Sequence, residues 1–175
     1  FNENWRWRKM GETEWKPTHL PHDALIFEDR KKDAESGVHL GWFTCHDYEY
    51  EKTFTLPASY ADKTLILEFE GVYRHAEVYL NGVKIAHRPY GYTNFYAPLQ
   101  GGQVRFDEEN TLKVIARNAD QPNSRWYSGA GIYRPVRLWV GEEKHILLNG
   151  VKIRTLQTHP AVVEMEIKTN GKGEI

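Results

Sequence analysis

The sequence predicts an all-β protein, an antiparallel β-sandwich of the jelly-roll type, on three observations. Short runs of β-branched and aromatic residues recur and are separated by Gly, Pro, Asn and Asp, as in strands joined by turns. An apolar stripe with the helical period of about 3.6 residues is missing. Several runs alternate apolar and polar residues, which gives a strand one buried and one wet face. Because parallel sheets need crossover helices, this pattern favours stacked antiparallel sheets.

Each predicted strand is a run that meets these criteria. Residues 64–69 are a clear case, since Leu65, Leu67 and Phe69 share one face while the other face is mostly polar. The runs in chain order are residues 48–56, 64–69, 76–80, 83–86, 111–116, 133–140 and 151–155.

The clearest local unit is a hairpin centred on Asn81-Gly82. Alternation on both sides of this dipeptide predicts a two-residue hairpin with a type I′ turn, which places Leu80 opposite Val83. The same register puts two groups of side chains on opposite faces. The core face receives Val78, Leu80, Val83 and Ile85, and the other face receives Glu77, Tyr79 and Lys84.

Two stretches depart from this pattern. Residues 17–46 combine turn residues and charges with few apolar positions, which predicts a long loop excursion, and such loops are usually functional or disordered. Towards the C-terminus, residues 146–156 and 161–169 are predicted as two strands of another domain. We therefore expect a sandwich domain at residues 1–144 and the start of a second domain at residues 145–175.

Composition excludes several classes of function. The chain has 175 residues, enough for one good core with a little left over. Its 23 basic residues nearly balance its 24 acidic residues, and no apolar run approaches the roughly 20 residues of a membrane helix, so we expect neither nucleic acid nor membrane as a partner. Cys45 is the single cysteine and is interpreted as a small buried filler. Together with the lack of a leader before Asn2, it favours a cytoplasmic location.

Residues 123–136, hereafter the site loop, form the most distinctive stretch. They read Asn-Ser-Arg-Trp-Tyr-Ser-Gly-Ala-Gly-Ile-Tyr-Arg-Pro-Val, and no folding periodicity requires this composition. At a sheet end, its arginines, tyrosines and tryptophan would present hydrogen-bond donors and flat apolar faces. Sugars offer hydroxyls and a C–H face to such groups, so the loop is typical of a sugar-binding surface. The alternative is a turn in which Trp126 and Tyr127 only cap the core.

The site loop also resembles a known family. Its segment Arg-Trp-Tyr-Ser-Gly-Ala-Gly-Ile-Tyr-Arg is similar to the signature near the end of the N-terminal sugar-binding domain of glycoside hydrolase family 2, which includes β-galactosidases and β-glucuronidases. Further segments are similar to stations of that domain in the same order, and they span nearly the whole chain. They are Phe1-Asn2-Glu3-Asn4-Trp5-Arg6, Leu20-Pro21-His22-Asp23, Tyr50-Glu51-Lys52-Thr53-Phe54, Phe69-Glu70-Gly71-Val72-Tyr73, Val78-Tyr79-Leu80-Asn81-Gly82 and Tyr90-Gly91-Tyr92-Thr93.

The resemblance implies a galactose-binding-domain-like jelly roll followed by an immunoglobulin-like sandwich. Two strands cannot complete the latter, which needs about seven, so the chain looks truncated. The resemblance also implies a parent that hydrolyses terminal β-linked sugars with retention, using two glutamates on a later (β/α)₈ barrel. Asn2-Glu3 resembles the family's Asn-Glu dipeptide but precedes any barrel and is rejected as catalytic. This segment is then expected to be inactive alone, to shape the pocket and to pack on the parent's other domains.

Two predicted substrate-binding residues are Asn123 and Asp23. In family members an acidic residue just before Arg-Trp-Tyr reaches towards the active-site pocket, and Asn123 stands at the matching position. An amide still donates and accepts hydrogen bonds but carries no charge, so the resemblance carries over the location and leaves the selectivity open. Asp23 is predicted either to approach a sugar or to serve as a structural cap within the long loop.

Arg125, Trp126 and Tyr127 complete the predicted substrate-binding set. Arg125, like Arg134, is expected to make forked, charge-assisted bonds either to a uronic-acid carboxylate or to a neighbouring Asp or Glu. Trp126 and Tyr127 are predicted as a sugar platform or as a contact surface for the barrel, and the same choice is open for Trp42. Packing roles are expected for the remaining tryptophans, Trp5, Trp7, Trp15 and Trp139.

Other chemistries are not supported, and no cofactor is expected. The eight histidines lack metal-ligand spacing, so no transition-metal site is predicted, while dependence on Mg²⁺, Na⁺ or Ca²⁺ stays open. Ser128 is not in a Gly-x-Ser-x-Gly elbow. Gly129 and Gly131 lack the third glycine of a dinucleotide motif and precede a strand.

Three readings remain beside the leading one, a β-galactosidase-like parent. The first is a β-glucuronidase parent, which needs a cationic clamp for the carboxylate. The second is an autonomous carbohydrate-binding module, and the third is a purely structural domain. The glycone, the linkage and the oligomeric state are undetermined, with a homo-oligomeric parent left open.

Overall fold

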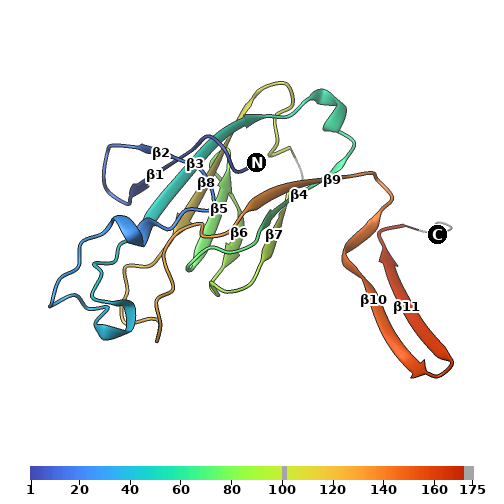
Figure 1. Ribbon diagram of the computed structural model, residues 1–175. Coiled ribbons are helices and arrows are strands. Elements are labelled where there is room, and N and C mark those ends of the chain that lie inside the picture. The colour runs from blue at the N-terminus through green and yellow to red at the C-terminus, as the bar shows by residue number, and fades with distance from the viewer. Residues whose placement is uncertain (100–101, 172–175) are drawn as a thin grey trace.

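The computed structural model describes residues 1–99 and 102–171, which form antiparallel β-sheets with short 3₁₀ helices in the loops (Figure 1). A six-stranded sheet has the order β2-β1-β3-β8-β5-β6 and a three-stranded sheet the order β7-β4-β9, while β10 and β11 pair separately. The fold confirms the predicted all-β antiparallel class. The bounds are β1 Trp5–Lys9, β2 Lys16–Thr18, β3 Tyr48–Thr55, β4 Thr64–Phe69, β5 Ala76–Leu80, β6 Val83–Arg88, β7 Phe95–Pro98, β8 Glu109–Ala116, β9 Val136–Gly141, β10 Ile146–Thr158 and β11 Ala161–Thr169.

The predicted strands agree with these bounds, and three strands were missed. β4, β5 and β11 match residue for residue, whereas β9 begins only at Val136, because Pro135 before it lacks a backbone N–H for the ladder. β2 and β7 are short and contain proline, which is tolerated at the sheet edges where both strands lie. β1 was missed although Trp5 and Trp7 alternate with arginines.

The core lies between the two larger sheets. Phe69 on β4 and Phe95 on β7 are direct cross-strand partners whose rings stack with centroids 4.9 Å apart. Trp5 and Trp7 are buried as predicted. Trp139 corrects that prediction, since it is 45% exposed on β9 and its indole N–H donates to Glu68 instead of packing in the core.

The hairpin of β5 and β6 has the predicted turn and a changed register. Asn81 and Gly82 both have positive φ, as a type I′ turn requires, and Leu80 pairs with Val83. A one-residue shift in the ladder then leaves Ile85 as an extra residue on β6, which is a β-bulge. Val83 was predicted in the core but is 48% exposed, because it begins an edge strand.

The long excursion is a loop, as predicted, and it also contributes to the core. It contains the 3₁₀ helices η1 (Ala24–Phe27) and η2 (Val38–Leu40), and a third, η3 (Ala58–Tyr60), follows β3. Within the excursion Leu25 and Leu40 are fully buried. Cys45 is half-buried, and burial together with the nearby Glu28 raises the pKa of its thiol to about 11, which disfavours the reactive thiolate.

The strand register brings five loops to one end of the sandwich, hereafter the loop end. Tyr48 at the start of β3 pairs with Ala116 at the end of β8, and Phe69 at the end of β4 pairs with both Phe95 and Val136. The segments that enter or leave these positions therefore meet at the same edge (Figure 1). They are residues 10–15, 19–47, 70–75, 89–94 and 117–135.

β10 and β11 project from the sandwich as a hairpin of their own (Figure 1). Most of their side chains are exposed on both faces. The predicted boundary at residues 144 and 145 falls between β9 and β10 and stays a prediction.

Candidate functional site

Backbone hydrogen bonds on both sides hold the second half of the site loop. Ala130 accepts from the N–H of Ala24 at 2.9 Å, and Gly131 exchanges two bonds of 2.9 Å with Tyr73. The loop is thus clamped between the long excursion and the segment that follows β4. These bonds satisfy backbone groups of the loop and hold its second half at the loop end.

A buried tyrosine beneath the loop explains one of its glycines. The Tyr50 hydroxyl lies 2.8 Å from Nδ1 of His22, and a Cβ on Gly131 would stand 1.9 Å from that hydroxyl. Gly131 also has φ +93°, which side chains rarely adopt. Burial lowers the pKa of His22 to about 4 in spite of the nearby Asp23, so the imidazole is neutral at physiological pH.

Asp23 binds the long excursion to the site loop. Its Oδ1 accepts from the N–H of Leu25 at 3.0 Å and of Ala130 at 2.9 Å, and its Oδ2 accepts from the Tyr127 hydroxyl at 2.6 Å. A Cβ on Gly129 would approach Oδ2 to 2.9 Å, so glycine is needed there too. Of the two roles predicted for Asp23, these contacts describe the structural cap. Its contact with a sugar stays a prediction.

Asn123 is held by hydrogen bonds to its neighbours, and its amide oxygen can accept one more. Its Nδ2 donates to the Asn118 side chain at 2.9 Å and to the Asp120 carbonyl at 2.7 Å, which uses both amide hydrogens. Its Oδ1 accepts from the Tyr73 hydroxyl at 3.1 Å. Since an amide oxygen has two lone pairs, Asn123 retains the capacity to accept one more hydrogen bond.

Trp126 and Tyr127 are the exposed aromatic faces of the loop. Trp126 is 71% exposed and Tyr127 is 50% exposed, so Trp126 does not cap the core. Tyr127 packs edge-on against Phe43 at 5.9 Å. Burial, the hydrogen bond to Asp23 and its charge raise the pKa of Tyr127, which keeps its hydroxyl protonated as a donor.

The arginines of the loop lie over aromatic rings. The guanidinium of Arg125 is 5.4 Å from the Trp126 ring centroid, and that of Arg134 is 5.6 Å from the Tyr133 ring centroid. Within residues 1–99 and 102–171 neither arginine forms an ion pair. The expected tie to an Asp or Glu is therefore wrong, and both forks keep donors for other partners.

A cluster of tyrosines beside the loop was missed from the sequence. The Tyr133 hydroxyl donates to the Gly91 carbonyl at 2.7 Å, and Tyr92, half exposed, packs edge-on against Tyr73 at 5.3 Å and against Tyr90 at 5.6 Å. A Cβ on Gly91 would stand 2.4 Å from the Tyr73 ring. The signal was the Tyr-Gly-Tyr triplet, whose glycine permits this close approach.

The loop end presents aromatic faces and hydrogen-bonding groups. Retaining glycoside hydrolysis needs two carboxyl groups about 5 Å apart. The site loop contains no Asp or Glu, and the oxygens of Asp23 already accept three hydrogen bonds. In the described part of the chain, no three His, Cys, Asp or Glu residues gather closely enough to hold a metal ion. No helix described there is both long and apolar enough to cross a membrane.

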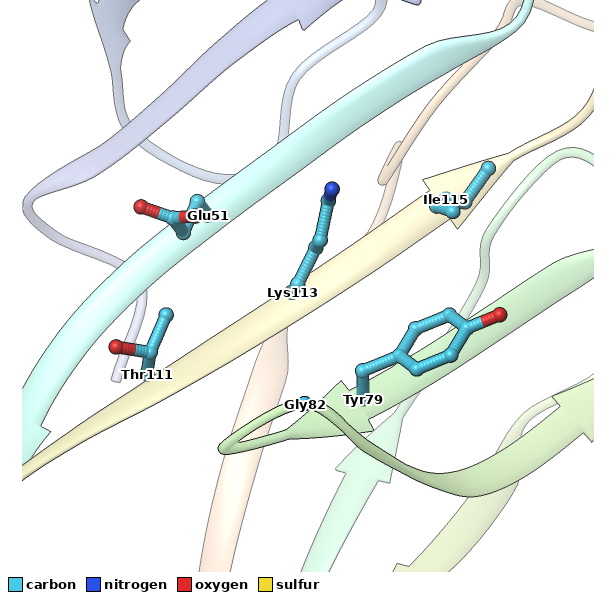
Figure 2. A pocket seen from close by; sticks show the side chains of 6 residues that line it. All are labelled: Glu51, Tyr79, Gly82, Thr111, Lys113 and Ile115. Carbon is cyan, nitrogen blue, oxygen red and sulfur yellow. The ribbon is translucent and has the colours of Figure 1, made fainter.

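The surface has a hollow near the loop end and another on the six-stranded sheet. A groove of ≈ 420 Å³ beside Asp23 is lined by Phe27, Lys16 and His19, among others. A hollow of ≈ 370 Å³ lies on the outer face of the six-stranded sheet, where Lys113 on β8 stands between Glu51 on β3 and Tyr79 on β5 (Figure 2). These charges have partners outside the hollow, since Lys113 pairs with Glu49 at 2.7 Å and Glu51 pairs with Arg6.

The fold and the loop end define a class of protein, an antiparallel β-sandwich that presents aromatic faces and hydrogen-bonding groups on one set of loops. Comparison with known proteins identifies the family within this class. Residues 5–159 match the family described as Glycosyl hydrolase 2 galactose-binding domain-like, and the chain belongs to this family.

Similar proteins include named glycosidases. The chain is 38% identical over 160 residues to the β-galactosidase BoGH2A of Bacteroides ovatus, with 86% of this chain and 18% of that protein covered. It is 30% identical over 157 residues to a β-glucuronidase of Bacteroides fragilis, with 82% of this chain and 20% of that protein covered. The crystal structure of a β-glycosidase from Bacteroides vulgatus superposes with a TM-score of 0.86 at 28% identity, covering 99% of this chain and 24% of that one. The chain thus spans about a fifth of the length of these relatives.

Proposed function

We propose that this chain is the N-terminal accessory domain of a retaining family 2 β-glycosidase, β-galactosidase-like, and that its site loop shapes the sugar pocket. The observation that carries the proposal is the hydrogen-bonded loop with an exposed Trp126, two arginines that form no ion pair within residues 1–99 and 102–171, and a remaining acceptor on Asn123. Such a surface provides stacking and hydrogen bonds to a sugar ring. The similarity to BoGH2A supports the galactosidase form.

The catalytic carboxyl groups belong to another domain in this proposal. A double displacement needs a nucleophile and an acid/base that face each other, and a (β/α)₈ barrel places such groups at the ends of its strands. The domain described here supplies recognition only, so it is predicted to be inactive alone. β10 and β11 are proposed to begin the immunoglobulin-like sandwich that connects this domain to the barrel. The cytoplasmic location favoured by the sequence stays a prediction.

Hydrolysis of a panel of nitrophenyl β-glycosides by the 175-residue chain and by the full-length product of its gene tests the proposal. Turnover by the full-length protein alone is expected. Turnover by the short chain would overturn the accessory role, and silence from both would favour an autonomous binding module.

Two substitutions in the full-length protein test the loop itself. Asn123→Ala and Trp126→Ala are each expected to lower kcat/KM by roughly one to three kcal/mol of transition-state stabilisation. Trp139→Ala is the matched control, because it removes another exposed indole, which lies outside the site loop on the outer face of the three-stranded sheet. If both loop variants keep the kcat/KM of this control, the domain is purely structural.

A β-glucuronidase parent is the second candidate, and the similarity to the Bacteroides fragilis enzyme supports it. It requires a cation for the substrate carboxylate. Direct comparison of nitrophenyl β-galactoside with β-glucuronide on the full-length protein decides between the two.

A further inference from the structure

A polar pocket lies on the outer face of the six-stranded sheet at the loop end. It has a volume of ≈ 330 Å³ and is formed at the start of β5, the end of β6 and the segments before β3 and after β8. We call it the Arg74 pocket. Its charged and imidazole residues are Arg74, Arg117, Asp47, Glu77, His75, His87 and Asp120.

Two of the acids in this pocket are paired with basic side chains, Arg117 inside the pocket and Lys84 beside it. Arg117 bridges Asp47 and Glu77, with distances of 3.2 Å to each. Glu77 also pairs with Lys84 at 3.2 Å and accepts from the Tyr79 hydroxyl at 2.9 Å. Although burial opposes it, these hydrogen bonds lower the pKa of Glu77 to about 2, so its carboxylate is charged at physiological pH.

Arg74 is left with unused donors. Its Nε is buried and has no hydrogen-bond partner within residues 1–99 and 102–171. The same residues contain no ion pair to Arg74. Buried donors without a partner are uncommon and indicate a ligand, an ion or ordered water. A guanidinium matches planar oxyanions because its donors form a rigid fork.

The two histidines add imidazoles, and their backbones are held by hydrogen bonds. His87 on β6 is the ladder partner of Glu77, and His75 has φ +45° and donates its N–H to the Pro89 carbonyl at 3.2 Å. A positive φ in a residue other than glycine is uncommon and recurs at functional sites. The pocket therefore combines the Arg74 guanidinium with two imidazoles.

We propose that the Arg74 pocket binds an oxyanion, a carboxylate or a sulfate carried by a saccharide, with Arg74 as the principal ligand. The saccharide part rests on the proposed function. The pocket adjoins the site loop. The hydroxyl of Tyr73, the residue before Arg74, donates to the Asn123 side chain, and the Asn123 amide donates to the carbonyl of Asp120. The exposed Asp120 carboxylate repels an anion. The affinity therefore depends on the balance between attraction by Arg74 and repulsion by Asp120.

Calorimetric titration of the full-length protein with sodium glucuronate, galactose 6-sulfate and galactose tests the proposal. Both anions are expected to show a binding component that depends on Arg74, and galactose is expected to lack it. Arg74→Met is expected to weaken this binding roughly tenfold or more, the effect of one charge-assisted hydrogen bond, and Arg74→Lys less. Asp120→Asn is expected to strengthen binding about two- to fivefold by removing a like charge. Arg105→Met is the matched control, because it removes an exposed positive charge away from the pocket.

The outcomes separate the pocket from the catalytic site. Loss of anion binding in Arg74→Met with an unchanged inhibition constant of glucuronate against nitrophenyl glycoside hydrolysis supports a distinct site. Binding of glucuronate alone identifies a carboxylate, and binding of the sulfate ester alone identifies a sulfate. Galactose binding that Arg74→Met weakens as much as it weakens anion binding, or anion binding that Arg74→Met and Asp120→Asn leave unchanged, would overturn the proposal. Anion binding that depends on Arg74 in a protein that hydrolyses no glycoside would keep the pocket and remove the glycosidase function.

Discussion

The sandwich and the C-terminal hairpin share an alternating strand pattern but differ in what covers it. On β4 the apolar residues Leu67 and Phe69 are fully buried by the opposite sheet. On β10 and β11, Ile153 is 59% exposed and Met165 is exposed as well. A two-stranded ribbon is marginally stable by itself, so the hairpin needs a further layer. The difference teaches that alternation indicates which residues suit burial, while the presence of a partner decides whether they are buried.

The largest effect is expected from a core substitution. Phe69→Ala removes a fully buried ring stacked on Phe95 and should lower the free energy of unfolding by about 3–5 kcal/mol. Ile153→Ala on the hairpin should change it by less than about 0.5 kcal/mol in the 175-residue chain. Urea unfolding of both variants measures this contrast. In the full-length protein, a cost of Ile153→Ala that stays this small would contradict a second sandwich over the hairpin.

A smaller effect is expected at a glycine beneath the site loop. Gly131→Ala combines a positive φ with a clash against the Tyr50 hydroxyl, and the clash should lower the free energy of unfolding by about 1–3 kcal/mol beyond the cost of the φ. Gly11→Ala is the control, because Gly11 has the same φ of +93° and a Cβ added there would meet nothing within 4 Å. Thermal unfolding compares the two. Equal losses would mean that backbone conformation alone, and not the support from Tyr50, fixes the loop.

Acid should weaken the fold through His22. Its folded pKa of about 4 lies below the unfolded 6.5, so the unfolded chain binds the proton first and stability falls as the pH drops from 6.5 to 4. The loss should be on the order of 2–3 kcal/mol, and His22→Gln should remove it. The exposed His39 provides the control His39→Gln. Urea unfolding across this pH range measures both, and an identical pH dependence of the two variants would exclude His22 as the cause.

The smallest effect concerns the contact between Asp23 and Tyr127. Asp23→Asn removes the carboxylate that helps to raise the pKa of Tyr127, so this pKa should fall towards its ordinary value. Phenolate absorbance during alkaline titration reports the change against the parent chain. An unaltered titration would show that burial alone raises the pKa of Tyr127.

Several features of the site followed from local sequence, and others did not. The location of the site loop could be predicted because its glycines, arginines and aromatic residues serve no strand periodicity. The neighbours of the arginines could not be predicted, since Arg125 and Arg134 lie over aromatic rings rather than beside acids. Tyr73 and Tyr92 were missed because they approach the loop only after separate strands bring their ends together.

The sequence by itself determined the antiparallel class, most strand positions and the Asn81-Gly82 turn, because alternation and turn chemistry act between near neighbours. Only the tertiary structure decided which groups remain without partners. The amide hydrogens of Asn123 are used by the fold, whereas the Nε of Arg74 is buried without an acceptor among the described residues. Such pairing depends on contacts between segments far apart in the chain, and local sequence carries no record of them.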